Sequence, residues 1–287
     1  MPSPCGCHNR SRLGRHPHRD WVALPPGMLS AILGKLENIE ILRGAGRVCR
    51  SWHRAAWDYP ELWRRINMLF HAELFFECGL HTLARTAVRR SAGLCEAFWG
   101  KYAGDDRLIL YLAEKAPSLK SLRFISCYDV CQEAFMEAMR KFPLLEELEL
   151  SISPNVCGEA FAVVGESCPN LKRFRRSKNQ FVIIERGGIN KGEEAMGIAK
   201  MHELCSLQLF ICELTNAGVA AIHDGCPDLD SLDIRQCFNV KMDRAAIRAK
   251  CSRIKMLKLP HDSTAGYEFQ FKIAATNLKL LFSLLKK

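Results

Sequence analysis

The chain has 287 residues, of which 48% are apolar and 25% are charged, and its formal charge is +10 at pH 7. These values are typical of an ordinary globular protein and exclude a collagen-like chain, a mainly disordered chain and a protein with many membrane spans. The positive charge is compatible with nucleic acid, an anionic membrane or an acidic partner, and selects none of them. The unusual number is that of the cysteines, 14 in all, which can mean disulfides, metal binding, reactive thiols or a structural demand for a small apolar residue.

Residues 1–19 are predicted to be a flexible basic leader. They carry arginines without the apolar core of a secretory signal, and no stretch of the chain has the apolar length that spans a membrane. We therefore expect the nucleus and/or the cytoplasm, no membrane partner and reduced cysteines, since stable disulfides are rare in those compartments. Cys5, Cys7 and His8 do not follow the spacing of paired zinc ligands. No metal and no cofactor is predicted.

Residues 20–66 are predicted to form three short helices. Leu24-Pro25 marks a helix start, and the apolar residues behind it recur at helical spacing. A second amphipathic stretch includes Trp52, and a third element ends at Trp63. So small a unit buries little apolar surface alone. Its large side chains therefore indicate either a partner surface or a cap on the rest of the chain.

Residues 91–265 repeat a phrase that reads LxxLxLxxC with tolerant substitution, after a predicted linker helix at 67–90. A strand and a helix in each unit of 25 or 26 residues are typical of leucine-rich repeats, whose units stack into a curved solenoid. A faint first copy begins at Leu94, which makes about seven copies. The first apolar positions of the clear copies, at intervals of 26, 26, 33, 25 and 25 residues, are Leu119, Leu145, Leu171, Leu204, Leu229 and Ile254. The predicted fold is therefore α/β, with a three-helix unit followed by a solenoid.

The repeat also explains six of the cysteines as packing residues. Three stand at the last position of the phrase, where the chain turns and a small side chain can reach a backbone group, and three stand just before a strand. No Cys–His motif places a base beside any of them. The first three are Cys127, Cys212 and Cys237, and the others are Cys168, Cys226 and Cys251.

Two segments depart from the repeat. The 33-residue interval indicates an insertion at 177–194, which either contacts a ligand or is a tolerated surface loop. Arg176, just before it, stands near positions that are apolar in other copies. Residues 266–287 do not continue the repeat. They form either an amphipathic helix that caps the solenoid or an altered reading-frame end, and the second interpretation is favoured.

The N-terminal unit resembles an F-box, on the phrases LPxxxLxxILxxL, VCRSW and LW. With the repeats behind it, the chain from about residue 20 to 269 resembles plant F-box/leucine-rich-repeat (F-box/LRR) proteins, in phrases such as LTNAG and LDIRQCFNV. Lys35 and the Gly44-Ala45-Gly46 run stand where other F-boxes often have different residues. The resemblance implies that the F-box binds the Skp1 adaptor, and through it a cullin–RING ubiquitin ligase. The implied Skp1 contacts are Leu24, Pro25, Leu29, Ile32, Leu36, Val48, Cys49, Trp52, Leu62 and Trp63.

The repeats are implied to hold a protein substrate whose identity the sequence does not reveal. Residues that alternate with the apolar positions of each strand are expected to point away from the core, on the concave side. Phe210 is the expected aromatic anchor, and Arg173 with Arg175 is the expected pair for a carboxylate or phosphate. Each of these positions can also be merely a solvated strand face. The candidates are Arg123, Glu147, Glu149, Arg173, Arg175, Gln208, Phe210, Asp233, Arg235 and Lys258.

The leading hypothesis is thus a non-catalytic substrate-recognition subunit of a Skp1–cullin–F-box ubiquitin ligase. The alternative is a leucine-rich-repeat interaction scaffold outside a ubiquitin ligase. An enzyme is not predicted, because the sequence contains no phosphate-binding, zinc-protease or nucleophile motif. Nucleic-acid binding is not predicted either, because more than half of the surplus positive charge lies in residues 1–66 and no basic stripe with interleaved aromatics crosses the repeats.

Overall fold

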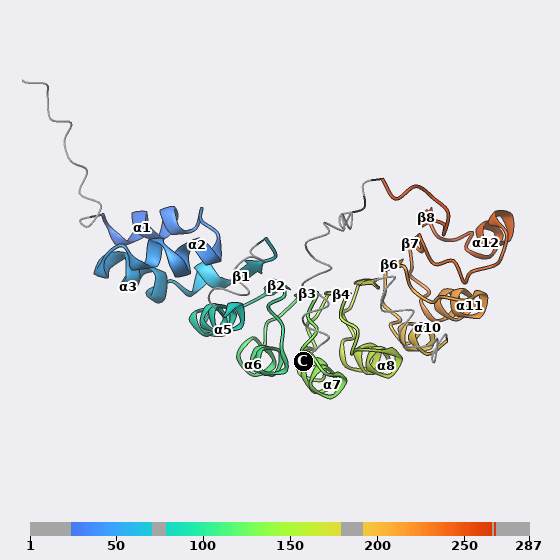
Figure 1. Ribbon diagram of the computed structural model, residues 1–287, viewed down its shortest axis with the longest axis horizontal. Coiled ribbons are helices and arrows are strands. Elements are labelled where there is room, and N and C mark those ends of the chain that lie inside the picture. Colours follow the sequence, from blue (N-terminus) through green and yellow to red (C-terminus); the bar gives the residue numbers. More distant parts are fainter. Residues whose placement is uncertain (1–23, 71–78, 179–191, 266, 268–287) are drawn as a thin grey trace, which may run out of the picture.

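The computed structural model describes residues 24–70, 79–178 and 192–265 together with Tyr267. A group of short helices is followed by a curved parallel sheet that helices line on one side (Figure 1). The predicted leader lies outside the described residues, as does the predicted tail apart from Tyr267. The helical unit followed by an α/β solenoid confirms the predicted fold class.

The N-terminal helices have a core of their own. Pro26 opens the first helix, where a missing N–H costs no hydrogen bond, and Leu33, Ala56 and Trp63 are fully buried between the helices. The indole Nε1 of Trp63 donates to the carbonyl of Ala56 at 3.0 Å, so the buried ring has its polar atom satisfied. The elements are α1 (Pro26–Leu33), α2 (Asn38–Arg43), the 3-10 helix η1 (Ala45–Arg47), α3 (Arg50–Asp58) and the 3-10 helix η2 (Pro60–Trp63).

In the described part of the chain, eight parallel strands follow in a single sheet whose order is the order of the sequence. A chain gives this order when it returns along the same side after every strand, as in a solenoid. The buried apolar residues stack in register, with Leu122 beside Leu148, Leu148 beside Phe174 and Phe174 beside Leu207. The strands are β1 (Arg65–Met68), β2 (Ala97–Lys101), β3 (Ser121–Ile125), β4 (Glu147–Ser151), β5 (Arg173–Ser177), β6 (Ser206–Phe210), β7 (Ser231–Asp233) and β8 (Met256–Lys258).

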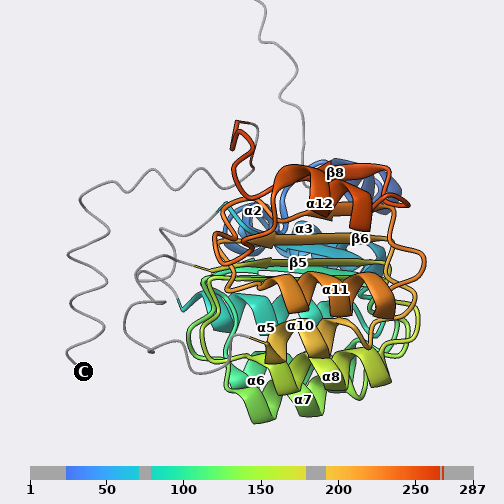
Figure 2. The ribbon, with the colours of Figure 1, turned by 90° about the vertical axis from the view of Figure 1, so that its right-hand side faces the viewer.

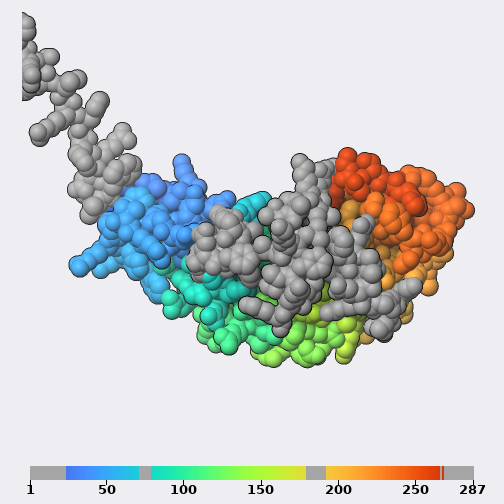
Figure 3. All heavy atoms as spheres, in the orientation of Figure 1, coloured from blue at the N-terminus to red at the C-terminus, as the bar shows by residue number. Residues whose placement is uncertain are grey.

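The returning segments form helices on the outer side of the sheet (Figures 1 and 2). Several begin at a polar side chain that accepts a backbone N–H, as Asp105 does from Leu108 at 2.7 Å. Figure 3 shows the resulting curved body, with the N-terminal helices at one end and the last repeat at the other. The helices are α5 (Leu80–Arg90), α6 (Asp106–Lys115), α7 (Gln132–Met139), α8 (Gly158–Ser167), α10 (Glu193–Ile198), α11 (Asn216–Gly225) and α12 (Arg244–Lys250).

Strand β1 extends the sheet beyond the repeats that the sequence pattern indicates. Strands β2 to β8 correspond to the seven copies counted from Leu94, whereas β1 lies across the boundary between the predicted helical unit (20–66) and the predicted linker helix (67–90). It pairs in parallel with β2, Arg65 beside Ala97. The interval between these partners is longer than 26 residues, so the period does not reveal it. The solenoid therefore begins directly behind the N-terminal helices.

The cysteine ladder is confirmed. Cys127 and Cys237 are buried, and their thiols donate to the carbonyls of Ile125 at 3.5 Å and Leu209 at 3.4 Å. Burial raises the pKa of the Cys127 thiol to about 12. These thiols satisfy backbone carbonyls at the turn and stay protonated at neutral pH, as packing residues do.

The turn before the ladder position uses left-handed backbone. The residues there are Ser126 (φ 53°), Ile152 (φ 55°), Ile211 (φ 56°) and Gln236 (φ 64°). This conformation is unfavourable for side chains, and most of all for the β-branched isoleucines. It recurs in these coils because the chain turns sharply from strand to helix while the ladder residue points inward. The geometry of the repeat thus outweighs the preference of these residues for negative φ angles.

Candidate functional site

The predicted Skp1 contacts divide into buried and accessible side chains. Leu29, Trp52 and Trp63 are buried and belong to the core of the N-terminal helices. These three side chains therefore hold the helices together and offer little surface of their own. The remaining seven keep at least partial exposure, namely Leu24, Pro25, Ile32, Leu36, Val48, Cys49 and Leu62.

Two apolar side chains of this unit are prominent at the surface. Val48, just before α3, is 60% exposed, and Met28 on α1 is 54% exposed. Val48 was among the predicted contacts, whereas Met28 was not. Exposed apolar side chains on a small helical unit can serve as contacts for a partner. Their presence fits the expectation that this unit docks on another protein.

Trp57 on α3 is a partly exposed aromatic residue that the sequence did not single out. It is 44% exposed, and the guanidinium groups of Arg89 and Arg90 on α5 lie 5.1 and 5.3 Å from its ring centroid. Arg90 also lies 5.2 Å from the ring of Trp63. Burial, and then the neighbouring Arg89, lowers the pKa of Arg90. These contacts fasten α3 and η2 to the first helix of the solenoid.

Asn38 links the N-terminal helices to the sheet. Its side chain is buried; its Nδ2 donates to the carbonyl of Leu62 at 3.2 Å, and its Oδ1 accepts from the backbone N–H of Asn67 on β1 at 2.9 Å. One side chain thus satisfies backbone groups on both sides of the junction. The helices are held in a defined orientation to the solenoid.

Six of the ten predicted substrate residues form one row across the strands. Neighbours in the sheet register are Arg123 and Glu149, Glu149 and Arg175, Arg175 and Gln208, Gln208 and Asp233, and Asp233 and Lys258. Since side chains at register partners point to the same face, the expectation that these residues share a face is confirmed.

The row is internally paired over β3 to β5. The Nε of Arg123 lies 2.6 Å from Oε2 of Glu149, and Glu149 also accepts from Ser151 at 2.8 Å. In the neighbouring row Arg173 and Glu147 form an ion pair. Each of these carboxylates already has a cation, so this half of the face presents little net charge.

A groove of about 280 Å³ opens over β5 to β8. Asp233 and Arg235 form a fork-to-fork pair in it, with Nε of Arg235 2.9 Å from Oδ1 and Nη2 2.7 Å from Oδ2. Nζ of Lys258 lies 3.6 Å from Oδ2 of Asp233, and its side chain is 57% exposed. The lining residues are Arg175, Ser206, Leu207, Gln208, Ser231, Leu232, Asp233, Arg235, Met256, Lys258 and Tyr267.

Phe210 is not the open aromatic anchor that the sequence led us to expect. It is 5% exposed, because Tyr267 lies flat against it with ring centroids 3.9 Å apart. The hydroxyl of Tyr267 is hydrogen-bonded to Ser177, and Arg235 lies 5.5 Å from the Tyr267 ring. Tyr267, which follows the last strand, thus covers the ring that was expected to meet a substrate. No local sequence pattern indicated this contact.

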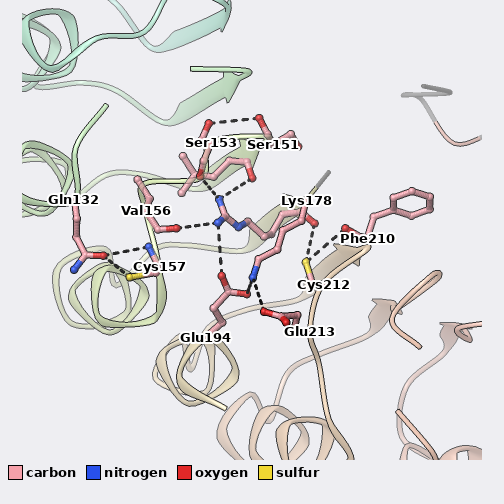
Figure 4. A network of polar contacts seen from close by, with 12 residues as sticks. Gln132, Ser151, Ser153, Val156, Cys157, Lys178, Glu194, Phe210, Cys212 and Glu213 are labelled. Atoms are coloured by element: carbon pink, nitrogen blue, oxygen red, sulfur yellow. Dashed lines mark hydrogen bonds and ion pairs between the residues drawn. The ribbon is translucent and has the colours of Figure 1, made fainter. Parts of the chain in front are cut away.

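The flanks of the predicted insertion meet around Arg176, whereas residues 179–191 lie outside the described part. Arg176 is buried, and its guanidinium donates to the carbonyls of Ser153 at 3.0 Å and Val156 at 2.8 Å. Glu194, the last residue of the predicted insertion, lies 3.6 Å from Arg176 and 3.0 Å from Lys178 (Figure 4). A buried charge is tolerated when it is paired and hydrogen-bonded. This network explains how the repeat accepts arginine where others carry an apolar residue.

Two absences concern the described residues only. Over residues 24–70, 79–178 and 192–265, His, Cys, Asp and Glu side chains do not gather in any group of three or more suited to a metal ion. The helices in the same ranges all fall short of the length and apolar character needed to cross a membrane.

Comparison with known proteins covers both regions. Residues 21–69 match the F-box-like family. The chain is 39% identical to F-box/LRR-repeat protein 23 of Arabidopsis thaliana over 249 residues, which cover 85% of this chain and 54% of that protein, so it spans about half of that relative's length. It is 37% identical to the F-box protein SKIP19 of the same plant over 85% of this chain and 78% of that protein. It is 36% identical to F-box/LRR-repeat protein 22, also of that plant, over 89% and 82%.

Proposed function

The chain belongs to the F-box/LRR family, and on that premise we propose that it is the substrate-recognition subunit of a Skp1–cullin–F-box ubiquitin ligase. The F-box, which we assign to residues 20–66, docks on a Skp1-like adaptor, and the repeats hold a protein substrate for ubiquitin transfer. The observation that carries the proposal is the F-box-like match at 21–69, in the segment that folds into α1 to η2. The ligase acts in the nucleus or the cytoplasm.

The geometry gives each region a separate task. Val48 and Met28 offer apolar contacts at the end of the molecule formed by the helices, while the substrate row lies along the strands. Asn38 and the Trp57–Arg89 contact keep the two regions in a defined orientation. A rigid receptor is what ubiquitin transfer needs, because it positions a bound substrate near a transferring thiol on another subunit. The chain itself supplies binding and positioning, without bond chemistry.

Co-expression with a Skp1-like adaptor tests the proposal. The chain should co-purify with the adaptor, and Val48→Glu should abolish the complex by placing a charge in an apolar contact. Val48 is 60% exposed, so the variant should keep the stability of the unmodified chain. The matched control is Met196→Glu, since Met196 is 62% exposed on α10, outside the F-box.

Two outcomes contradict the proposal. If the unmodified chain forms no complex with the adaptor, the alternative of a repeat scaffold outside a ubiquitin ligase is favoured. If both glutamate variants bind the adaptor equally well, the complex does not use the F-box surface described above.

A further inference from the structure

We propose that the groove over β5 to β8 binds an anionic side chain of an acidic peptide segment, with Lys258 as its principal cation. The inference deepens the proposed function, because it assigns a class of substrate segment to one part of the concave face. It rests on three features of the groove, which are its charge, its polar floor and its contrast with the other half of the face.

The first feature is a positive charge that the groove does not neutralise by itself. Arg235 holds Asp233 through both carboxylate oxygens, at 2.9 and 2.7 Å, and donates its Nη1 to the carbonyl of Ser263 at 2.8 Å. Both oxygens of the Asp233 carboxylate therefore have a hydrogen-bond partner without Lys258. Nζ of Lys258 reaches Asp233 only at 3.6 Å, and its side chain is 57% exposed. Its ammonium can turn toward an incoming anion at little cost.

The second feature is a floor suited to a peptide. Ser206, Gln208 and Ser231 line the groove from β6 and β7, and their side chains can donate to and accept from peptide groups. Met256 borders it with 64% exposure and offers an adaptable apolar contact. Hydrogen-bonding groups beside a cation and an exposed methionine match a short extended segment that carries acidic side chains.

The third feature is the contrast between the two halves of the concave face. Over β3 to β5, Arg123 is paired with Glu149 at 2.6 Å, and Arg173 is paired with Glu147. An anion that bound there would have to displace an existing carboxylate. Over β7 and β8 only the 3.6 Å contact between Lys258 and Asp233 has to open, and Arg235 still holds that carboxylate, so the groove is the favoured place for an anionic group.

The lining favours a peptide over a nucleic acid. Asp233 lines the groove and Glu149 flanks it next to Arg175, and carboxylates there oppose a continuous phosphate backbone. Bases would need an open aromatic platform, but the ring of Tyr267 is stacked on Phe210 and 5% of the residue is exposed. One or two separate anionic side chains fit this lining better than a polyanion does.

Fluorescence anisotropy with the full chain tests the inference. The probes are three labelled serine-rich peptides of equal length that carry two glutamates, two phosphoserines or two lysines, together with a labelled oligothymidine. The variants are Lys258→Glu and the matched control Lys255→Glu, which makes the same charge change three residues away. Lys255 is 75% exposed, pairs with Asp230 and does not line the groove.

The glutamate or the phosphoserine peptide should bind, and Lys258→Glu should weaken it about tenfold, against less than about twofold for Lys255→Glu. The better of the two peptides identifies the anionic group. Equal weakening by both variants, or no binding of either anionic peptide, would overturn the inference. So would oligothymidine binding that depends on Lys258 and exceeds that of the peptides.

Failure here can be separated from failure of the proposed function. Lys258→Glu should leave co-purification with the Skp1-like adaptor unchanged. If the adaptor complex forms but neither anionic peptide binds, only the groove assignment fails. If an anionic peptide binds through Lys258 and the adaptor does not bind, the groove assignment stands and the ligase role fails.

Discussion

Tyr267 lies flat on Phe210, with ring centroids 3.9 Å apart and ring planes 13° from parallel. Phe210 ends β6, whereas Tyr267 follows the last strand of the sheet. The contact therefore brings the chain back from the last repeat over two earlier strands. It covers an aromatic side chain that would otherwise be exposed on the concave face.

Replacement of Tyr267 should expose Phe210 and destabilise the solenoid. Tyr267→Ala should lower the free energy of unfolding by about 2 kcal/mol, because a stacked pair and buried ring area are lost. Tyr267→Phe should cost about 1 kcal/mol or less, because it keeps the stack and loses only the hydrogen bond with Ser177. Urea unfolding measures both values. Equal losses for the two variants would show that the hydroxyl, rather than the stack, holds this contact.

Asn38 should prove important for the junction between F-box and solenoid. Asn38→Ala removes the hydrogen bonds to the carbonyl of Leu62 and the N–H of Asn67, two partly buried backbone groups, which should cost about 1–3 kcal/mol. Asn38→Asp retains an acceptor for Asn67 and loses the donor to Leu62, so its stability should be intermediate. Thermal unfolding would check this order. An alanine variant as stable as the unmodified chain would contradict it.

Arg176 should be far more sensitive to truncation than its neighbour Arg173. Arg176→Ala removes the donors to Ser153 and Val156 and one of the two cations beside Glu194, and should cost about 3 kcal/mol. Arg173 has a side chain that is 61% exposed, so Arg173→Ala should change stability by less than about 1 kcal/mol. Denaturant unfolding of the two variants makes the comparison. Similar losses would mean that the buried network contributes little.

Alkaline pH should weaken the fold through the buried ladder thiols. Burial raises the pKa of Cys127 from its ordinary value of 9.0 to about 12, so between these values the unfolded chain loses a proton that the folded chain keeps. The stability from this group is complete below pH 9 and is lost as pH rises toward 12, by about 1.4 kcal/mol per pH unit.

The control for this pH dependence is Cys127→Ala. Its unfolding free energy should fall less steeply than that of the unmodified chain between pH 9 and pH 11, where Cys127 contributes to the slope. Two parallel slopes would show that this thiol is not shielded from solvent in the folded chain.

Much of this protein could be predicted from local patterns. The 25-residue period predicted strands β2 to β8 and their order, since strand alternation and repeat length depend only on nearby residues. The same period placed Cys127, Cys212 and Cys237 on a buried ladder. The phrases around Leu24 and Trp52 indicated the F-box, to whose family the chain belongs.

The rest depended on contacts between residues far apart in the chain. Strand β1 lies outside the period and joins the sheet because the F-box helices place it beside β2. Arg123 was expected on an open face and is instead paired with Glu149, a partner that only the strand register brings within 2.6 Å. Phe210 is covered because the chain returns to place Tyr267 on it. A repeat period determines which residues share a face. Which of them stay available to a partner depends on pairing across strands and on where the chain folds back, and tertiary structure alone decides that.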